Sequence, residues 1–146
     1  MLNNLLFVCV GNICRSPMAA GFFSNQLKEL NDITINSAGL HAVVGESAVS
    51  KAQKVMLDIG IDISEHRAQQ LTYDMVSTAN LVLVMEKAHK KEIESIIPAS
   101  RGKVYLLGQW QDFEIPDPYC EPIEAFDQSL LLIKQAWQDW RLRIVR

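Results

Sequence analysis

The stretch LLFVCVGNICRSP, Leu5 to Pro17, decides how the rest of the sequence is interpreted. It begins with an uninterrupted apolar run, Leu5–Cys9, which is typical of a strand that is covered on both faces in a parallel sheet. It ends with Ser16 and Pro17, residues that favour the N-cap and the first position of a helix. The order strand, short loop, helix is therefore predicted here, with a cysteine at the end of the strand and Arg15 beside the start of the helix.

Further apolar runs alternate with helical patterns along the whole chain. We predict strands at 33–36, 81–85 and 104–107, and helices at 17–30, 47–59, 86–97 and about 126–144. Ser47 is expected to cap the second helix and Gly60 to end it. In the last helix apolar residues recur at steps of three and four, and its residues Trp137 and Trp140 are expected to pack on the sheet. The alternation predicts a single α/β domain over residues 1–146: three layers, with a four-stranded parallel sheet flanked by helices, doubly wound and flavodoxin-like.

The composition excludes several classes of protein. Hydrophobic residues make up 49% of the chain and charged residues 21%, as in soluble globular domains. The net charge of −3 argues against a nucleic-acid binder that relies on bulk positive charge. There is no apolar run of the roughly 18 residues needed to cross a bilayer and no basic start of a signal peptide, so we expect a cytoplasmic protein without membrane insertion. Three cysteines do not form the framework of a secreted disulfide-rich protein.

The loop after the first strand has the composition of an anion-binding site. Gly11 and Asn12 tolerate unusual backbone angles, so the loop can turn sharply and point its N–H groups inward. The helix start adds its positive dipole end, and the guanidinium of Arg15 matches phosphate oxygens. We expect a phosphate-binding loop that consists of Val10, Gly11, Asn12, Ile13, Cys14 and Ser16, with the thiol of Cys9 at its base.

The thiol at the base of such a loop would be favoured in its thiolate form, because charge-assisted hydrogen bonds contribute about 1.5–3 kcal/mol each. Ser16 could donate one of these bonds through its hydroxyl. The simpler alternative is that Cys9 is a buried strand residue followed by an ordinary turn. A metal site made of Cys9, Cys14 and a histidine is less favourable because Arg15 would repel the cation, and the nucleotide-binding pattern GxxxxGK[ST] is absent.

The segment CVGNICRS resembles the signature of the low-molecular-weight protein tyrosine phosphatases. Further matches are SAG at 37–39, HRAQQ at 66–70 and DPY at 117–119. The resemblance implies a phosphatase that needs no metal or other cofactor. It implies that Cys9 attacks phosphorus to form a phosphocysteine, that Arg15 and the loop amides bind the phosphoryl oxygens, and that Asp117 is the general acid and base.

The resemblance also assigns residues around this loop. Asn12 is expected in the left-handed region of backbone angles, with Ser37 and His66 hydrogen-bonded to it. Tyr119 and Leu40 are expected to form opposite walls of a slot for the phenol ring, deep enough to exclude phosphoserine. We expect the two remaining histidines, His41 and His89, to be surface residues.

Two cysteines remain. Cys14 matches a loop cysteine that can form a reversible disulfide with the nucleophile, and an exposed thiol of low pKa beside a resolving thiol is typical of redox-sensitive sites. Cys120 departs from animal members, which tend to have a second tyrosine there. The sequence does not decide whether a disulfide between Cys9 and Cys14 regulates activity, nor does it indicate the oligomeric state.

The segments SAGLHAVVG and RGKVYLLGQW resemble the bacterial branch of the family. Members of that branch act on membrane tyrosine autokinases that control capsule and exopolysaccharide assembly. The implied partner is therefore a phosphotyrosine protein, such as an autokinase with a cytoplasmic tail. Two alternatives are less favourable. A thioredoxin-coupled arsenate reductase would need two further cysteines around the third strand, and residues 81–91 contain none. A non-catalytic phosphotyrosine-binding module would be expected to lack the nucleophile or the acid, whereas Cys9, Arg15 and Asp117 are all present.

Overall fold

The four strands form one parallel sheet, as the alternation predicts. In the computed structural model, which describes residues 2–145, the strands are β1 (Asn4–Cys9), β2 (Thr34–Gly39), β3 (Leu81–Val84) and β4 (Val104–Leu106). Their order in the sheet is β2-β1-β3-β4, and all three pairings are parallel. The chain therefore builds β2 on one side of β1 and then crosses to build β3 on the other side. The end of β1 is a topological switch point, where ligands bind in sheets of this type.

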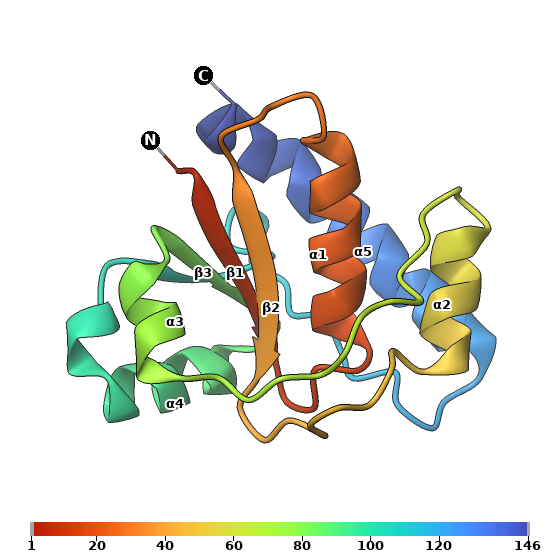
Figure 1. The fold of residues 1–146 in the computed structure, drawn as a ribbon, viewed down its shortest axis with the longest axis horizontal. Helices are drawn as coiled ribbons and strands as arrows, with labels where there is room; N and C mark the ends of the chain where they lie inside the picture. The colour runs from red at the N-terminus through yellow and green to blue at the C-terminus, as the bar shows by residue number, and fades with distance from the viewer. Residues whose placement is uncertain (1, 146) are drawn as a thin grey trace.

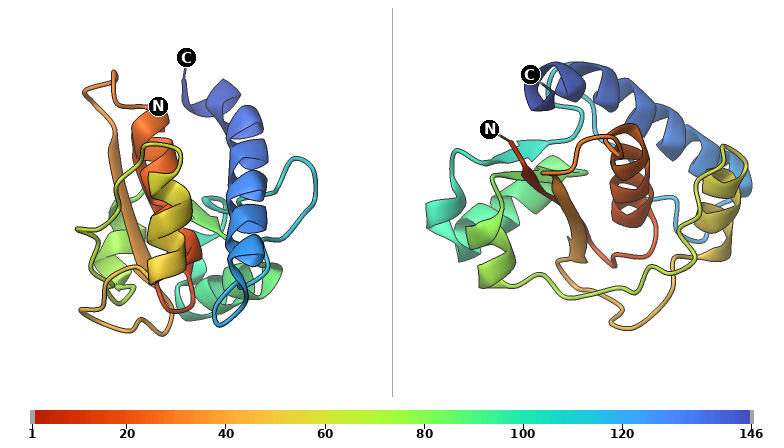
Figure 2. Two further views of the ribbon diagram at one scale, coloured as in Figure 1. Left: turned by 90° about the vertical axis from the view of Figure 1, so that its right-hand side faces the viewer. Right: turned by 45° about the horizontal axis from the view of Figure 1, so that its top comes forward.

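Helices cover both faces of the sheet. They are α1 (Arg15–Gln26), α2 (Ser50–Leu57), α3 (Tyr73–Thr78), α4 (Lys87–Ile96) and α5 (Ile123–Ile144), with a 3₁₀ turn at Pro98–Ser100. Figures 1 and 2 show α1, α2 and α5 together on one side of the sheet and α3 and α4 on the other. Side chains of β1 point alternately to the two faces of the sheet. Leu5 and Phe7 belong to the core on the side of α1, α2 and α5, and Leu6 and Val8 to the core on the side of α3 and α4. The prediction of a three-layer α/β fold is confirmed.

The C-terminal helix is anchored by its aromatic residues. Trp137 meets the ring of Phe23 edge-on, with the ring centres 5.1 Å apart. The indole N–H of Trp140 donates to the carbonyl oxygen of Leu107, just beyond β4, at 2.7 Å. Both tryptophans are buried in the core, as predicted. Among residues 2–145, no helix is both long and apolar enough to cross a membrane.

The starts of two helices differ from the prediction. Helix α1 begins at Arg15, so Ser16 is inside the helix and does not cap it. Helix α2 begins at Ser50 and not near Ser47, because the preceding segment runs along the phosphate loop, where the N–H of Val49 donates to the carbonyl oxygen of Ile13 at 2.9 Å. Gly60 follows α2 with φ of +80°, in agreement with the predicted helix end. Helix α3, which Thr72 caps through its hydroxyl, was not predicted.

Candidate active site

The loop between β1 and α1 turns its carbonyl groups outward. The carbonyl oxygens of residues 9, 10, 11 and 13 accept hydrogen bonds from the N–H groups of residues 40, 41, 43 and 49 at 2.9–3.1 Å. The carbonyl of Asn12 accepts from His66 Nε2 at 2.7 Å. The C=O and N–H of one trans peptide point in opposite directions, so the N–H groups of this loop face the inner side. That arrangement is an anion-binding nest at the N-terminus of a helix, at the carboxyl edge of the sheet in Figure 1.

Asn12 holds this loop from within. Its φ is +60°, in the left-handed region as predicted, and its side chain is completely buried. Its side-chain nitrogen donates to the hydroxyls of Ser16 at 2.7 Å and Ser37 at 3.0 Å. Its side-chain oxygen accepts from the N–H of Gln69 at 2.9 Å. The predicted contacts of Asn12 with Ser37 and His66 are therefore present, and Gln69 is a further support within the HRAQQ segment.

The end of β2 approaches the loop closely. A methyl group added at Gly39 would lie 2.5 Å from the carbonyl oxygen of Val10, so only glycine fits at this contact. Gln70 fixes the next residues, because its side chain accepts from the N–H of Ala42 and donates to the carbonyl of Leu40. The SAG and HRAQQ segments thus meet the phosphate loop in space.

His66 supports the loop as a neutral donor. Burial lowers the pKa of its imidazole, and the neighbouring Arg67 lowers it further, while the bond to the Asn12 carbonyl opposes this effect. A carbonyl oxygen can only accept, so Nε2 carries the hydrogen in this contact. The other ring nitrogen of His66 is then unprotonated at neutral pH.

The thiol of Cys9 lies at the end of β1 beside a hydroxyl. Its Sγ is 2.9 Å from the Oγ of Ser16, and both side chains are buried. The Ser16 oxygen already accepts a hydrogen from Asn12, so its own hydrogen is free to point at the sulfur. This serine therefore serves the thiol and the loop, which explains why it does not cap the helix.

The guanidinium of Arg15 is fixed on two sides. It is 2% exposed, and its Nη1 donates to Glu86 Oε2 and to the carbonyl oxygen of Ile115, the latter at 2.8 Å. Its Nη2 lies 3.8 Å from Asp117 Oδ2. Glu86 was not among the predicted site residues. The available signal was its position directly after the predicted strand at 81–85; that this strand pairs with β1, and so places Glu86 near Arg15, is known only from the structure.

His89 corrects the sequence prediction for the histidines. His41 is a surface residue, with its side chain 72% exposed, but His89 is only 5% exposed. Its ring packs at the start of α4, where Nδ1 accepts the N–H of Glu86 at 3.2 Å. The prediction that His89 is exposed is therefore wrong, because its ring helps to cap a helix.

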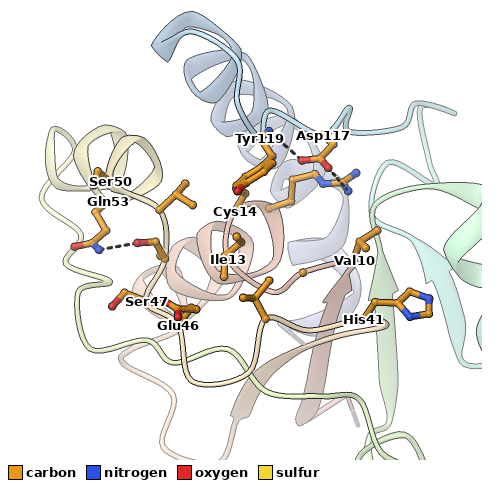
Figure 3. Close-up of a pocket in the computed structure, with 15 residues that line it drawn as sticks. Val10, Ile13, Cys14, His41, Glu46, Ser47, Ser50, Gln53, Asp117 and Tyr119 are labelled. Atoms are coloured by element: carbon orange, nitrogen blue, oxygen red, sulfur yellow. Dashed lines mark hydrogen bonds and ion pairs between the residues drawn. The ribbon is translucent and has the colours of Figure 1, made fainter.

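A cavity of about 690 Å³ opens above the phosphate loop. Its lining comes from Val10, Gly11, Ile13, Cys14 and Arg15 of the loop and the start of α1, His41, Val43, Glu46, Ser47, Ala48, Val49, Ser50 and Gln53 of the following segment, and Asp117 and Tyr119. Figure 3 shows Asp117 and Tyr119 on one side of this cavity and Glu46 and Ser47 on the opposite side. Asp117 is half exposed, and its Oδ1 accepts the N–H of Tyr119 at 3.0 Å.

Leu40 does not line this cavity. Its side chain is buried in the core cluster on the α3–α4 side of the sheet, together with Val8. Leu40 and His41 form a turn directly after β2. His41 contributes to the cavity lining, but its ring extends outward, with Nε2 3.2 Å from Glu92 Oε2. Tyr119 is on the cavity wall as predicted, but Leu40 is not in the lining, and Glu46 and Ser47 lie on the side opposite Tyr119 (Figure 3).

Cys14 is a buried thiol. It is 3% exposed, and its pKa is raised to about 12, first by burial, then by the nearby carboxylate of Asp117 and by Cys9, against the influence of Arg15. Cys14 is therefore protonated at neutral pH. Cys14 is expected as the resolving thiol beside Cys9, and the two lie within one loop. The exposed thiol that the redox pattern requires is not present, because Cys9 is also only 3% exposed.

Known proteins are similar to this one along nearly the whole chain. The sequence profile of the low molecular weight phosphotyrosine protein phosphatases matches residues 4–146. The chain belongs to this family. A relative from Ralstonia nicotianae, the probable low molecular weight protein-tyrosine-phosphatase EpsP, is 46% identical over 99% of this chain and 97% of its own length.

Solved structures agree with this assignment. The tyrosine phosphatase AmsI of Erwinia amylovora superimposes with a TM-score of 0.93 at 41% identity, covering 100% of this chain and 95% of that one. Wzb of Vibrio vulnificus, solved in complex with benzylphosphonate, gives a TM-score of 0.92 at 38% identity, covering 98% and 99% of the two chains. The phosphatase is thus a hydrolase of the protein-tyrosine-phosphatase class, and the matches support neither the reductase nor the binding-module alternative.

Proposed function

We propose that the phosphatase hydrolyses phosphotyrosine through a phosphocysteine formed on Cys9. The sulfur attacks phosphorus, an S–P bond forms, and the bond from phosphorus to the phenol oxygen breaks. Asp117 gives its proton to the departing oxygen, because phenolate is a poor leaving group. Water then attacks the same phosphorus, Asp117 takes its proton, and the S–P bond breaks to release phosphate.

The observation that carries this proposal is the inward-facing set of loop amides between a buried thiol and a buried arginine. Donors that are already oriented stabilise developing charge without reorganisation, and removal of one such donor typically slows a reaction 10²- to 10³-fold. Hydrogen bonds from Nη1 of Arg15 to Glu86 and to the Ile115 carbonyl fix the orientation of the guanidinium. Its remaining N–H donors are therefore oriented before a phosphoryl group binds.

The depth of the site supports a preference for phosphotyrosine. Cys9 is 3% exposed and lies below the loop, while Tyr119 and Val43 stand at the cavity wall. An aromatic ring between these walls carries the phosphoryl group down to the sulfur. A phosphoserine side chain is too short to reach the thiol from the same backbone position.

The physiological substrate in this proposal is a tyrosine autokinase of capsule or exopolysaccharide assembly, dephosphorylated on its cytoplasmic tail. The phosphatase would then act in the cytoplasm on a membrane-bound partner without entering the membrane. Support comes from the similarity to bacterial phosphatases such as EpsP and AmsI along nearly the whole chain.

The test is hydrolysis of a phosphotyrosine peptide and its phosphoserine counterpart in the presence of a chelator. We expect turnover of the phosphotyrosine peptide only, with Cys9→Ser reducing kcat by about three orders of magnitude or more. Cys120→Ser, which changes an exposed thiol outside the loop, serves as the matched control and should keep wild-type activity. Substantial turnover by Cys9→Ser would rule out the thiol mechanism.

A further inference from the structure

His89 is a buried histidine that the proposed chemistry does not use. It is the third residue of α4, and its ring contacts Glu86 at two points. The N–H of Glu86 donates to Nδ1 at 3.2 Å, and Nε2 lies 3.6 Å from Glu86 Oε2. The backbone N–H of His89 in turn donates to the carbonyl oxygen of Glu86 at 3.0 Å and lies beside its carboxylate, so the two residues form a capping box at the start of α4.

The same carboxylate oxygen also binds the arginine of the site. Glu86 Oε2 accepts the hydrogen bond from Arg15 Nη1 and is the oxygen that His89 Nε2 approaches. Glu86 is thereby placed between a buried imidazole and a buried guanidinium. Because the backbone of Glu86 is bonded to His89 on both its N–H and its carbonyl, and the ring stands 3.6 Å from its carboxylate, the position of Glu86 is set before substrate arrives.

The hydrogen bonds fix the protonation state of His89 in this arrangement. Nδ1 accepts a hydrogen from Glu86, so it carries none of its own, and the neutral ring has its hydrogen on Nε2, facing the carboxylate. Protonation would set a second N–H against that of Glu86 and add a positive charge near Arg15. The charged groups around the ring are Arg15 from α1, Glu86 and Glu92 of the α4 segment, and Glu114 from the segment after β4. Burial foremost, and then Arg15, lower the pKa of His89, while the three carboxylates oppose this shift.

We propose that His89, as a neutral imidazole, is a positioning residue that fixes Glu86 and through it the guanidinium of Arg15. The inference rests on the proposed role of Arg15 in binding the phosphoryl group. It adds that the geometry of this arginine depends on a histidine that is absent from the cavity lining.

The experiment compares three variants in binding and in turnover. His89→Leu removes both ring contacts at similar volume. His89→Asn keeps an acceptor near the position of Nδ1 but cannot be protonated. Thr72→Ala removes the cap of α3, a helix outside the hydrogen bonds and ion pairs of Arg15, and controls for loss of a helix cap alone. The Kd of inorganic phosphate is measured by calorimetry and kcat with p-nitrophenyl phosphate, after urea unfolding has shown each variant to be folded.

We expect His89→Leu to raise the Kd of phosphate and to lower kcat by roughly 10- to 100-fold, the range that displaced catalytic geometry produces. Thr72→Ala should change neither quantity. His89→Asn should restore most of both at neutral pH. As the pH is lowered through the pKa of His89, which lies below its usual value, the His89→Asn variant should also lose less phosphate affinity than the wild type, because asparagine cannot be protonated. The titration of phosphate itself cancels in this comparison.

Wild-type values in folded His89→Leu would overturn the inference. If that variant does not fold, the same dependence of phosphate Kd on pH in the wild type and in His89→Asn would overturn the inference instead. Failure of the proposed function would be seen separately, as a wild type that binds phosphate but hydrolyses no aryl phosphate.

Discussion

Asn12 combines a backbone angle and a set of contacts that few residues can supply at once. Its φ of +60° lies in the left-handed region of backbone angles, which Asn tolerates better than most residues that carry a β-carbon. Its amide joins the hydroxyls of Ser16 and Ser37 and the N–H of Gln69. One side chain thus connects the nucleophile's serine to the end of β2 and to the segment after α2.

Two substitutions separate these contributions. Asn12→Ala should lower the free energy of unfolding by about 2–4 kcal/mol, because it leaves buried polar groups without partners. Asn12→Gly removes the same bonds but relieves the backbone, so it should be about 1 kcal/mol less destabilised than the alanine variant. Urea unfolding measures both. Equal stability of the two variants would mean that the backbone angle carries no strain.

Asp117 gives a prediction about the leaving group. Asp117→Asn should lower kcat for phenyl phosphate by about 100-fold or more, because the poor leaving group then departs without a proton. The loss for p-nitrophenyl phosphate, whose phenol leaves readily, should be much smaller. Steady-state kinetics with both esters decides this point. An equal loss for the two would show that the proton comes from another group.

The sequence predicted contacts that depend on residue types within one loop. It did not predict contacts that depend on how separate strands and helices pack together. The left-handed backbone of Asn12 and the contact of Ser16 with the Cys9 thiol could be predicted because their neighbours in the chain define the loop. Leu40 was misplaced because its direction depends on which face of the sheet the chain leaves. The link from Arg15 to Glu86 depends on the strand order, which the pattern of apolar runs does not specify.

At the scale of elements, one strand and one helix supply the reactive side chains, and other segments support the loop between them. β1 and α1 deliver the thiol and the arginine, and the segments after β2 and α2 hold the loop from outside. The helix starts were harder to predict than the strands, because serine hydroxyls have more than one use. Ser16 looks like a cap in sequence but bonds to Cys9 and Asn12, while Thr72 caps α3 within a polar stretch that gave no clear helical period.

Helix α5 tests whether the fold and the site can be separated. Trp140→Phe removes the bond to the Leu107 carbonyl and part of the buried ring, so the free energy of unfolding should fall by about 2–3 kcal/mol. Because Trp140 does not line the cavity, kcat should stay at the wild-type value. Urea unfolding and steady-state kinetics on the same sample provide the measurement. A fall in kcat for fully folded enzyme would contradict this separation.

For the whole molecule, the order β2-β1-β3-β4 explains why distant segments meet at one place. β1 lies between β2 and β3, so residues that follow each of these three strands come together at one edge. Gly39, Glu86 and the phosphate loop are neighbours for this reason. The repeated strand–helix pattern predicts the class of fold, and the functional site then follows from the central position of the first strand.

The buried histidines predict how stability depends on pH. Burial is the main cause of the lowered pKa of both His66 and His89, so the unfolded chain binds protons more readily than the folded one. Their contribution to stability is present above pH 6.5 and is lost as the pH falls through their folded pKa values. The free energy of unfolding should therefore decrease from pH 7.5 to 5.5, by at most about 1.4 kcal/mol per pH unit for each histidine.

His66→Gln tests this dependence, because its amide can still donate to the Asn12 carbonyl but does not titrate. Urea unfolding at the two pH values should show a smaller decrease for this variant than for the wild type. The same decrease in both proteins would show that His66 does not contribute.

The most direct test of the central claim is to trap the phosphoryl enzyme. The wild type and Cys9→Ser are mixed with p-nitrophenyl phosphate, quenched during turnover, digested and examined by mass spectrometry. We predict that one phosphoryl group is found on the wild-type peptide that contains Cys9 and that Cys14 is unmodified. A phosphoryl group on another residue, or turnover with no phosphoryl enzyme at all, would contradict the assignment of Cys9 as the nucleophile.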